Sequence, residues 1–177
     1  MDTEGSKQTG EGVFAELSPL HFFSIYTVVQ VQSLDRVGRE IVGICASWRP
    51  NGESTEIVDF PRCYDLFWLW VLGSYEVIRT MKQHSPRCFS AAAQGRISVA
   101  YLKIKPIRIP FAKQENQNGS GPIYAENSVS GFGRGMKFRI NGTLIDSTDL
   151  IEEILEFFNS FVRADVVGQI PTGPRDQ

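Results

Sequence analysis

Arg79 and His84 are the side chains whose types and spacing come nearest to a reactive pair in this chain of 177 residues. A histidine that titrates near neutral pH can accept the proton of an RNA 2′-hydroxyl group or protonate the leaving group. An arginine can hold the phosphate and stabilise the charge that develops on it. Together the two side chains predict metal-independent cleavage of an RNA phosphodiester.

The Arg79-x4-His84 spacing, near the end of an otherwise apolar helix, resembles the motif of HEPN ribonucleases. Thr80 stands where that family often has Asn, Asp or His. The resemblance implies a helical bundle that acts as a dimer, in which the arginine and histidine serve transphosphoesterification of RNA. Residues five apart on one helix lie about 140° apart around its axis, so the pair meets only through a bend, fraying of the helix or a second subunit. The alternative interpretation is a solvated helix end in which Arg79 pairs with Glu76.

A second group of candidate residues is a basic line near the middle of the chain. Its side chains are predicted to contact phosphate or a protein partner, or to form the solvated face of an edge strand. The glycine-rich segment 131–135 precedes a predicted strand, whereas phosphate loops precede a helix, so it predicts a flexible approach to the hairpin. With two histidines and no matching cluster, we expect no metal and no cofactor. The basic line consists of Lys103, Lys105, Arg108 and Lys113.

Composition excludes several classes of protein. The net charge is −2 and the pI is about 5.7, which gives no support for a general nucleic-acid binder. Cys45, Cys63 and Cys88 contain no CxxC pair, so their spacing argues against a disulfide framework or a zinc site. Reduced thiols and a polar N-terminus without the apolar core of a signal peptide predict a cytoplasmic location.

The elements that position these groups are organised around residues 63–84. Aromatic and aliphatic side chains recur there at steps of three and four on several faces, which predicts a helix buried on several sides. Its unbroken apolar run, 66–72, is far shorter than the roughly 20 residues that span a membrane. We therefore expect a buried aromatic core helix and no membrane span.

The segments around this helix are less uniform. Ser18-Pro19 predicts a helix start, and the stretch to residue 48 is one long helix or two elements. We expect helix throughout, although 19–30 could also be a strand. A turn is predicted at 49–55, and Ser85-Pro86 is expected to stop the central helix. Residues 90–105 suit helix or strand, with helix favoured by the alanines at 91–93. Two prolines predict that 103–113 is extended or an edge strand.

The C-terminal part gives the clearest local pattern. Asn141-Gly142 between two apolar–polar alternating runs predicts a β-hairpin over 136–146 with a type I′ turn. A helix is expected over 150–162, with Asp149 and Glu152 as a pair resembling a capping box. The polar, glycine-rich residues 114–135 predict a long loop.

These observations predict an α+β fold that is mainly α. A helical bundle surrounds the aromatic helix and is closed by the hairpin and the C-terminal helix. The domain is expected over 13–167, between flexible tails at 1–12 and 168–177. The leading functional hypothesis is a small soluble non-enzymatic module that binds a protein or forms a homo-oligomer through apolar surface around Trp68 and Trp70. The alternative is a HEPN-like endoribonuclease that uses Arg79 and His84.

Overall fold

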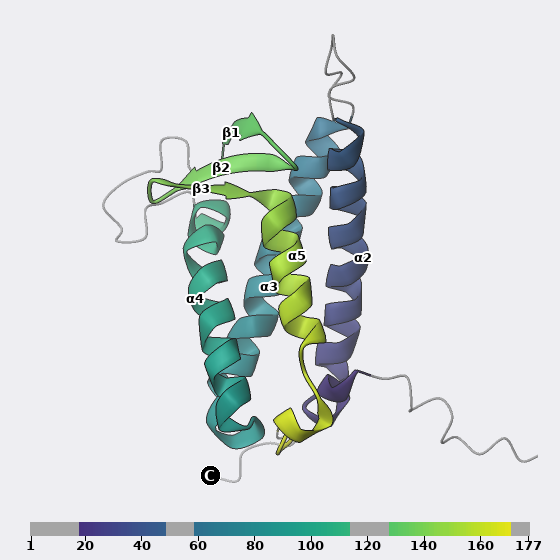
Figure 1. Ribbon diagram of the computed structural model, residues 1–177, viewed down its shortest axis with the longest axis vertical. Helices are drawn as coiled ribbons and strands as arrows, with labels where there is room; N and C mark the ends of the chain where they lie inside the picture. Colours follow the sequence, from purple (N-terminus) through teal and green to yellow (C-terminus); the bar gives the residue numbers. More distant parts are fainter. Residues whose placement is uncertain (1–17, 49–58, 114–127, 171–177) are drawn as a thin grey trace, which may run out of the picture.

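The computed structural model describes residues 18–48, 59–113 and 128–170. Four long helices form a bundle, and a three-stranded antiparallel sheet in the order β1-β2-β3 lies across one end of it (Figure 1). The mainly helical α+β fold predicted from the sequence is thereby confirmed. The helices are α2 (Ile25–Ser47), α3 (Phe60–Cys88), α4 (Ala91–Lys113) and α5 (Ser147–Asn159), with short 3₁₀ helices η1 (Pro19–Phe22) and η2 (Arg163–Asp165) at the other end.

The helix predicted from residue 19 to residue 48 is interrupted near its start. Ser18 does begin a helical turn, because its hydroxyl accepts a hydrogen bond from the Leu20 amide, but this turn is η1 and ends at Phe22. Phe23 is fully buried, and its carbonyl accepts the Ile170 amide. Ser24 then caps α2 by accepting the Thr27 amide, so the chain starts a second helix in a new direction.

The central helix is longer than the predicted 63–84. Phe67 and Trp70 are buried in it, as the apolar pattern predicts. Pro86, expected to stop the helix, lies inside its last turn, where its missing amide removes the hydrogen bond to the carbonyl four residues earlier. Helix α3 nevertheless continues for two residues beyond the proline, to Cys88. The turn predicted at 49–55 lies outside the described residues.

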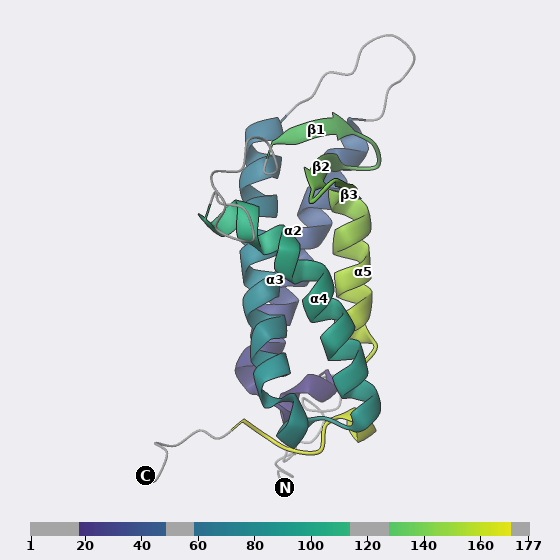
Figure 2. The ribbon, with the colours of Figure 1, turned by 90° about the vertical axis from the view of Figure 1, so that its left-hand side faces the viewer.

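The prediction of an extended segment at 103–113 is wrong, because the whole segment belongs to α4. Pro106 and Pro110 lie inside this helix. Buried Ile104, Ile107 and Phe111 hold this end of α4 against the core. The cost of two lost backbone hydrogen bonds is offset by this burial. Figure 2 shows α4 bending across the front of α3 in this half, the usual effect of proline within a helix.

The predicted hairpin is confirmed in position and in turn type. Strands β2 (Met136–Ile140) and β3 (Thr143–Asp146) pair antiparallel, and Asn141 and Gly142 have φ angles of 48° and 78°. A third strand, β1 (Val129–Phe132), pairs with β2. The long loop predicted over 114–135 therefore contains a strand at its end, while 114–127 lie outside the described residues.

The C-terminal helix begins three residues before the predicted 150–162. Asp146, not Asp149, is its N-cap: one carboxylate oxygen of Asp146 accepts the Thr148 amide at 2.9 Å. After η2, the amides of Val167 and Gly168 donate to the Cys88 carbonyl, so the fold extends past the predicted boundary at 167. Residues 1–12 and 171–177 lie outside the described part of the chain. None of the described helices is long and apolar enough to cross a membrane.

Candidate functional site

Arg79 and His84 both lie on α3, which runs as one helix through both positions. The Arg79 guanidinium forms an ion pair with Glu76 at 2.7 Å, with 39% of the arginine side chain exposed. The His84 ring lies 6.4 Å from the ring of buried Phe23. Within the described residues, no hydrogen bond or ion pair joins Arg79 to His84. One chain therefore does not assemble the predicted nuclease pair, and Arg79 has the structural partner that its sequence position offered.

The basic line does not form one surface, because it lies on a helix and not on a strand. Lys103 forms an ion pair with Glu153 of α5. Lys105 and Arg108 lie over the rings of Tyr101 and Tyr75, on the side of α4 that faces α3. The side chain of Lys113 lies outside the described residues. The three described side chains of the basic line are therefore divided between two sides of α4.

Of the two central tryptophans predicted to lie on an exposed apolar surface, one is buried and the other is partly exposed. Trp70 has 1% of its surface accessible, and its indole N–H donates to the Leu34 carbonyl of α2 at 3.0 Å. Trp68 has 41% accessible, and its indole N–H donates to the Phe111 carbonyl at the end of α4. Trp70 is therefore a core residue, and of the two tryptophans Trp68 is the one that contributes exposed apolar surface.

An open apolar surface lies between α4 and α5. Helix α4 packs mainly against α3, and α5 packs mainly against α2, so the two helices touch each other at few points. Two pockets of about 570 and 430 Å³ follow one another along this gap, and both are lined by Lys103 and Glu153, whose ion pair bridges it. Val99 and Leu102 on its α4 side are each 68% exposed. We call this feature the α4–α5 groove.

Charge is distributed unequally across the α4–α5 groove. Helix α4 contains five basic residues and no acidic one, whereas α5 contains four acidic residues and no basic one. The two helices run in opposite directions: α4 rises toward the sheet and α5 descends from it (Figure 1). The groove itself is lined by Arg96 and Lys103 of α4 and by Asp149, Glu153 and Glu156 of α5, so one edge is positive and the other negative. The basic residues of the whole α4 helix are Arg96, Lys103, Lys105, Arg108 and Lys113; the acidic residues of α5 are Asp149, Glu152, Glu153 and Glu156.

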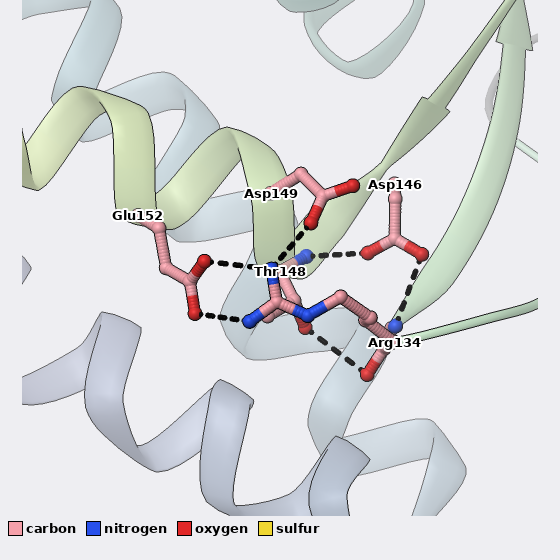
Figure 3. A network of polar contacts seen from close by, with 6 residues as sticks. Arg134, Asp146, Thr148, Asp149 and Glu152 are labelled. Carbon is pink, nitrogen blue, oxygen red and sulfur yellow. Dashed lines mark hydrogen bonds and ion pairs between the residues drawn. The ribbon is translucent and has the colours of Figure 1, made fainter.

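The last three residues of the glycine-rich segment, 133–135, form the β1–β2 turn and pack against the start of α5. The Arg134 guanidinium binds Asp149 and Glu152, and its carbonyl accepts the Thr148 hydroxyl (Figure 3). The Gly135 amide donates to Asp146. Asp149 and Glu152 thus hold Arg134 and do not form the predicted capping box. The acidic side chains at the start of α5 therefore stabilise the β1–β2 turn, because they bind Arg134 of that turn.

Sequence reasoning missed the α4–α5 groove, although its charge pattern is visible in the sequence.

Within the described residues, no cluster of three His, Cys, Asp or Glu side chains is placed to hold a metal ion. Comparisons with protein-family models, with curated proteins and with solved structures give no significant match.

Proposed function

We propose that the protein is a self-assembling module whose copies associate through the α4–α5 groove. The observation that carries this proposal is that a basic helix and an acidic helix form the two sides of the apolar α4–α5 groove. Val99 and Leu102 are exposed, and covering such apolar side chains with a partner lowers the free energy of the assembly. The charged edges determine which partner fits.

A second copy of the chain has the charge pattern that this groove requires. A two-fold axis running along the groove places α4 of each copy over α5 of the other, so basic residues meet acidic residues in both halves. A two-fold axis across the groove places α4 over α4 and α5 over α5, so like charges meet. Electrostatics therefore favours the first arrangement. In it Lys103 faces Glu153 of the second copy, while Val99 and Leu102 are covered.

Charge reversal tests the proposal because the two edges lie on different helices. Lys103→Glu and Glu153→Lys each place like charges across the interface, so each variant alone is expected to be monomeric. Mixed in equal amounts, the two variants restore opposite charges at both contacts between copies, while each chain keeps its own repulsive pair. Recovery of a dimer on mixing therefore reports contact between copies and not the pair within one chain.

The measurement is light scattering coupled to size-exclusion chromatography at tens of micromolar protein. Wild type is expected at twice the 19.8 kDa of one chain. Lys105→Glu is the matched charge control, because Lys105 lies on α4 but faces Tyr101. Leu69→Asp is the apolar control for Val99→Asp, since Leu69 is exposed on α3 away from the groove. A wild-type monomer, or a dimer that Val99→Asp leaves intact, would refute the proposal.

The nuclease hypothesis has less support. It requires Arg79 and His84 to act as one unit, whereas Arg79 is paired with Glu76 and both lie on one continuous helix. A dimer formed through the α4–α5 groove uses other helices and does not bring the two α3 helices together. The self-assembling module is therefore the function that the geometry supports better.

A further inference from the structure

Two of the three cysteines contact each other, although they are 18 positions apart in the sequence. The sulfur atoms of Cys45 and Cys63 are 3.6 Å apart. Cys45 lies near the end of α2 and Cys63 near the start of α3, and both are buried. Cys88 is buried near the opposite end of α3. The fold thus creates a dithiol at the end of the bundle that carries the sheet.

The surroundings of the two thiols differ. The pKa of Cys45 is lowered by a hydrogen bond from the Cys63 thiol; burial raises it, and the Met136 amide and the Ser147 hydroxyl lower it further. The pKa of Cys63 is raised far above the ordinary value for a thiol, first by its hydrogen bond to Cys45 and then by burial. Cys45 is therefore the more acidic of the two thiols and the one that ionises first.

We propose that Cys45 and Cys63 form a redox pair that hydrogen peroxide converts to a disulfide. The Cys45 thiolate attacks one peroxide oxygen, the O–O bond breaks, and the departing hydroxide takes up a proton to become water. The sulfur of Cys63 then attacks the sulfenic sulfur of Cys45, and the hydroxyl group leaves with the Cys63 proton as a second water. Two thiols and one peroxide thus yield one disulfide and two waters.

The distances allow this step with little movement. A disulfide requires a sulfur–sulfur separation of about 2.05 Å, so the two sulfur atoms must approach by about 1.5 Å. Both residues lie in the terminal turns of their helices, where the backbone adjusts more readily than in the middle of a helix. Because both thiols are buried, peroxide reaches them when this end of the bundle opens locally. Local opening therefore sets the rate of oxidation.

Peptide mapping identifies the pair directly, because trypsin separates all three cysteines. Cleavage after Arg39, Arg62 and Arg79 releases Cys45 in 40–62 and Cys63 in 63–79, and cleavage after Arg87 and Arg96 releases Cys88 in 88–96. After native protein is treated with peroxide and unreacted thiols are alkylated, we expect peptides 40–62 and 63–79 joined by a disulfide. The count of free thiols should fall from three to one.

Variants and stability separate this pair from unspecific oxidation. Cys88→Ala should form the same cross-link as wild type, whereas Cys45→Ala and Cys63→Ala should not. The oxidised protein should melt about 5–10 °C higher than the reduced protein, because the cross-link restricts the unfolded chain, and dithiothreitol should reverse the shift. Wild-type or Cys88→Ala protein that keeps its Cys45 and Cys63 thiols under peroxide, or a cross-link that contains peptide 88–96, would overturn the proposal.

Discussion

Gly135→Ala is expected to destabilise the protein, although the change adds a single methyl group. A Cβ atom at Gly135 would lie 2.4 Å from the Ser147 hydroxyl oxygen, 2.6 Å from the Thr148 hydroxyl oxygen and 2.9 Å from the Thr148 amide nitrogen. All three distances are shorter than protein atoms tolerate, and the Thr148 nitrogen is backbone. The β1–β2 turn must therefore move away from the start of α5.

The magnitude follows from the contacts that this movement breaks. The Ser147 hydroxyl accepts the Met136 amide at 2.9 Å, the Thr148 hydroxyl donates to the Arg134 carbonyl at 3.3 Å, and the Gly135 amide donates to Asp146 at 3.1 Å. Each such hydrogen bond contributes about 1 kcal/mol, and leaving the groups unpaired in this buried place costs more. We expect a loss of about 2–4 kcal/mol, which corresponds to a melting temperature lower by about 5–12 °C.

Gly131→Ala is the matched control because it adds the same methyl group to the same glycine-rich segment. A Cβ atom at Gly131 meets no atom within 4 Å, so its melting temperature should change by no more than about 2 °C. Thermal unfolding followed by circular dichroism measures both variants. Equal melting temperatures for the two variants would show that the turn does not pack against α5 as described.

Three further results are expected. Gly142→Val should cost about 1 kcal/mol or more in chemical denaturation, because valine resists the φ angle of 78° at this position; an unchanged midpoint would contradict the type I′ turn. Burial raises the pKa of Asp165, but the Val162 amide, Arg96 and Ser90 hold it below its usual value, so the stabilisation is present above about pH 4 and is lost as pH falls further. Asp165→Asn should thus be less stable than wild type at pH 7, with a difference that narrows toward pH 2. Finally, purified protein should leave RNA uncut. The nuclease hypothesis would be revived if the protein cut RNA, if EDTA had no effect on the cleavage, and if His84→Ala abolished it.

Local chemistry that depends on a few adjacent residues was readable from the sequence. Asn141-Gly142 specifies its turn because both residues tolerate positive φ angles, and the structure has them there. The apolar pattern around Phe67 and Trp70 identified the central helix because a helix buried on several sides needs apolar residues on several faces. These signals do not depend on distant parts of the chain.

The errors arose where packing overrides a local preference. Pro106 and Pro110 argue against helix, yet buried Ile107 and Phe111 stabilise α4 through both prolines. The charge difference between α4 and α5 was visible in the sequence, but their adjacency depends on where the hairpin places α5. No residue pattern inside either helix encodes that placement. The predicted pair of Arg79 and His84 likewise could not be assessed without the course of α3.

The position of α5 between α2 and α4 also bears on the order in which the chain folds. Helices α2, α3 and α4 follow one another in sequence and pack as successive neighbours, whereas α5 packs on α2 across about 100 intervening residues. Contacts of such long separation form late, because a large loop must close before they contribute. During synthesis α2 is made well before α5. The side of α2 around Gly38, against which Ile151 packs in the folded protein, therefore stays exposed until α5 is made. A nascent chain that stalls before residue 147 would therefore expose an apolar surface to which chaperones can bind and through which the chain can aggregate.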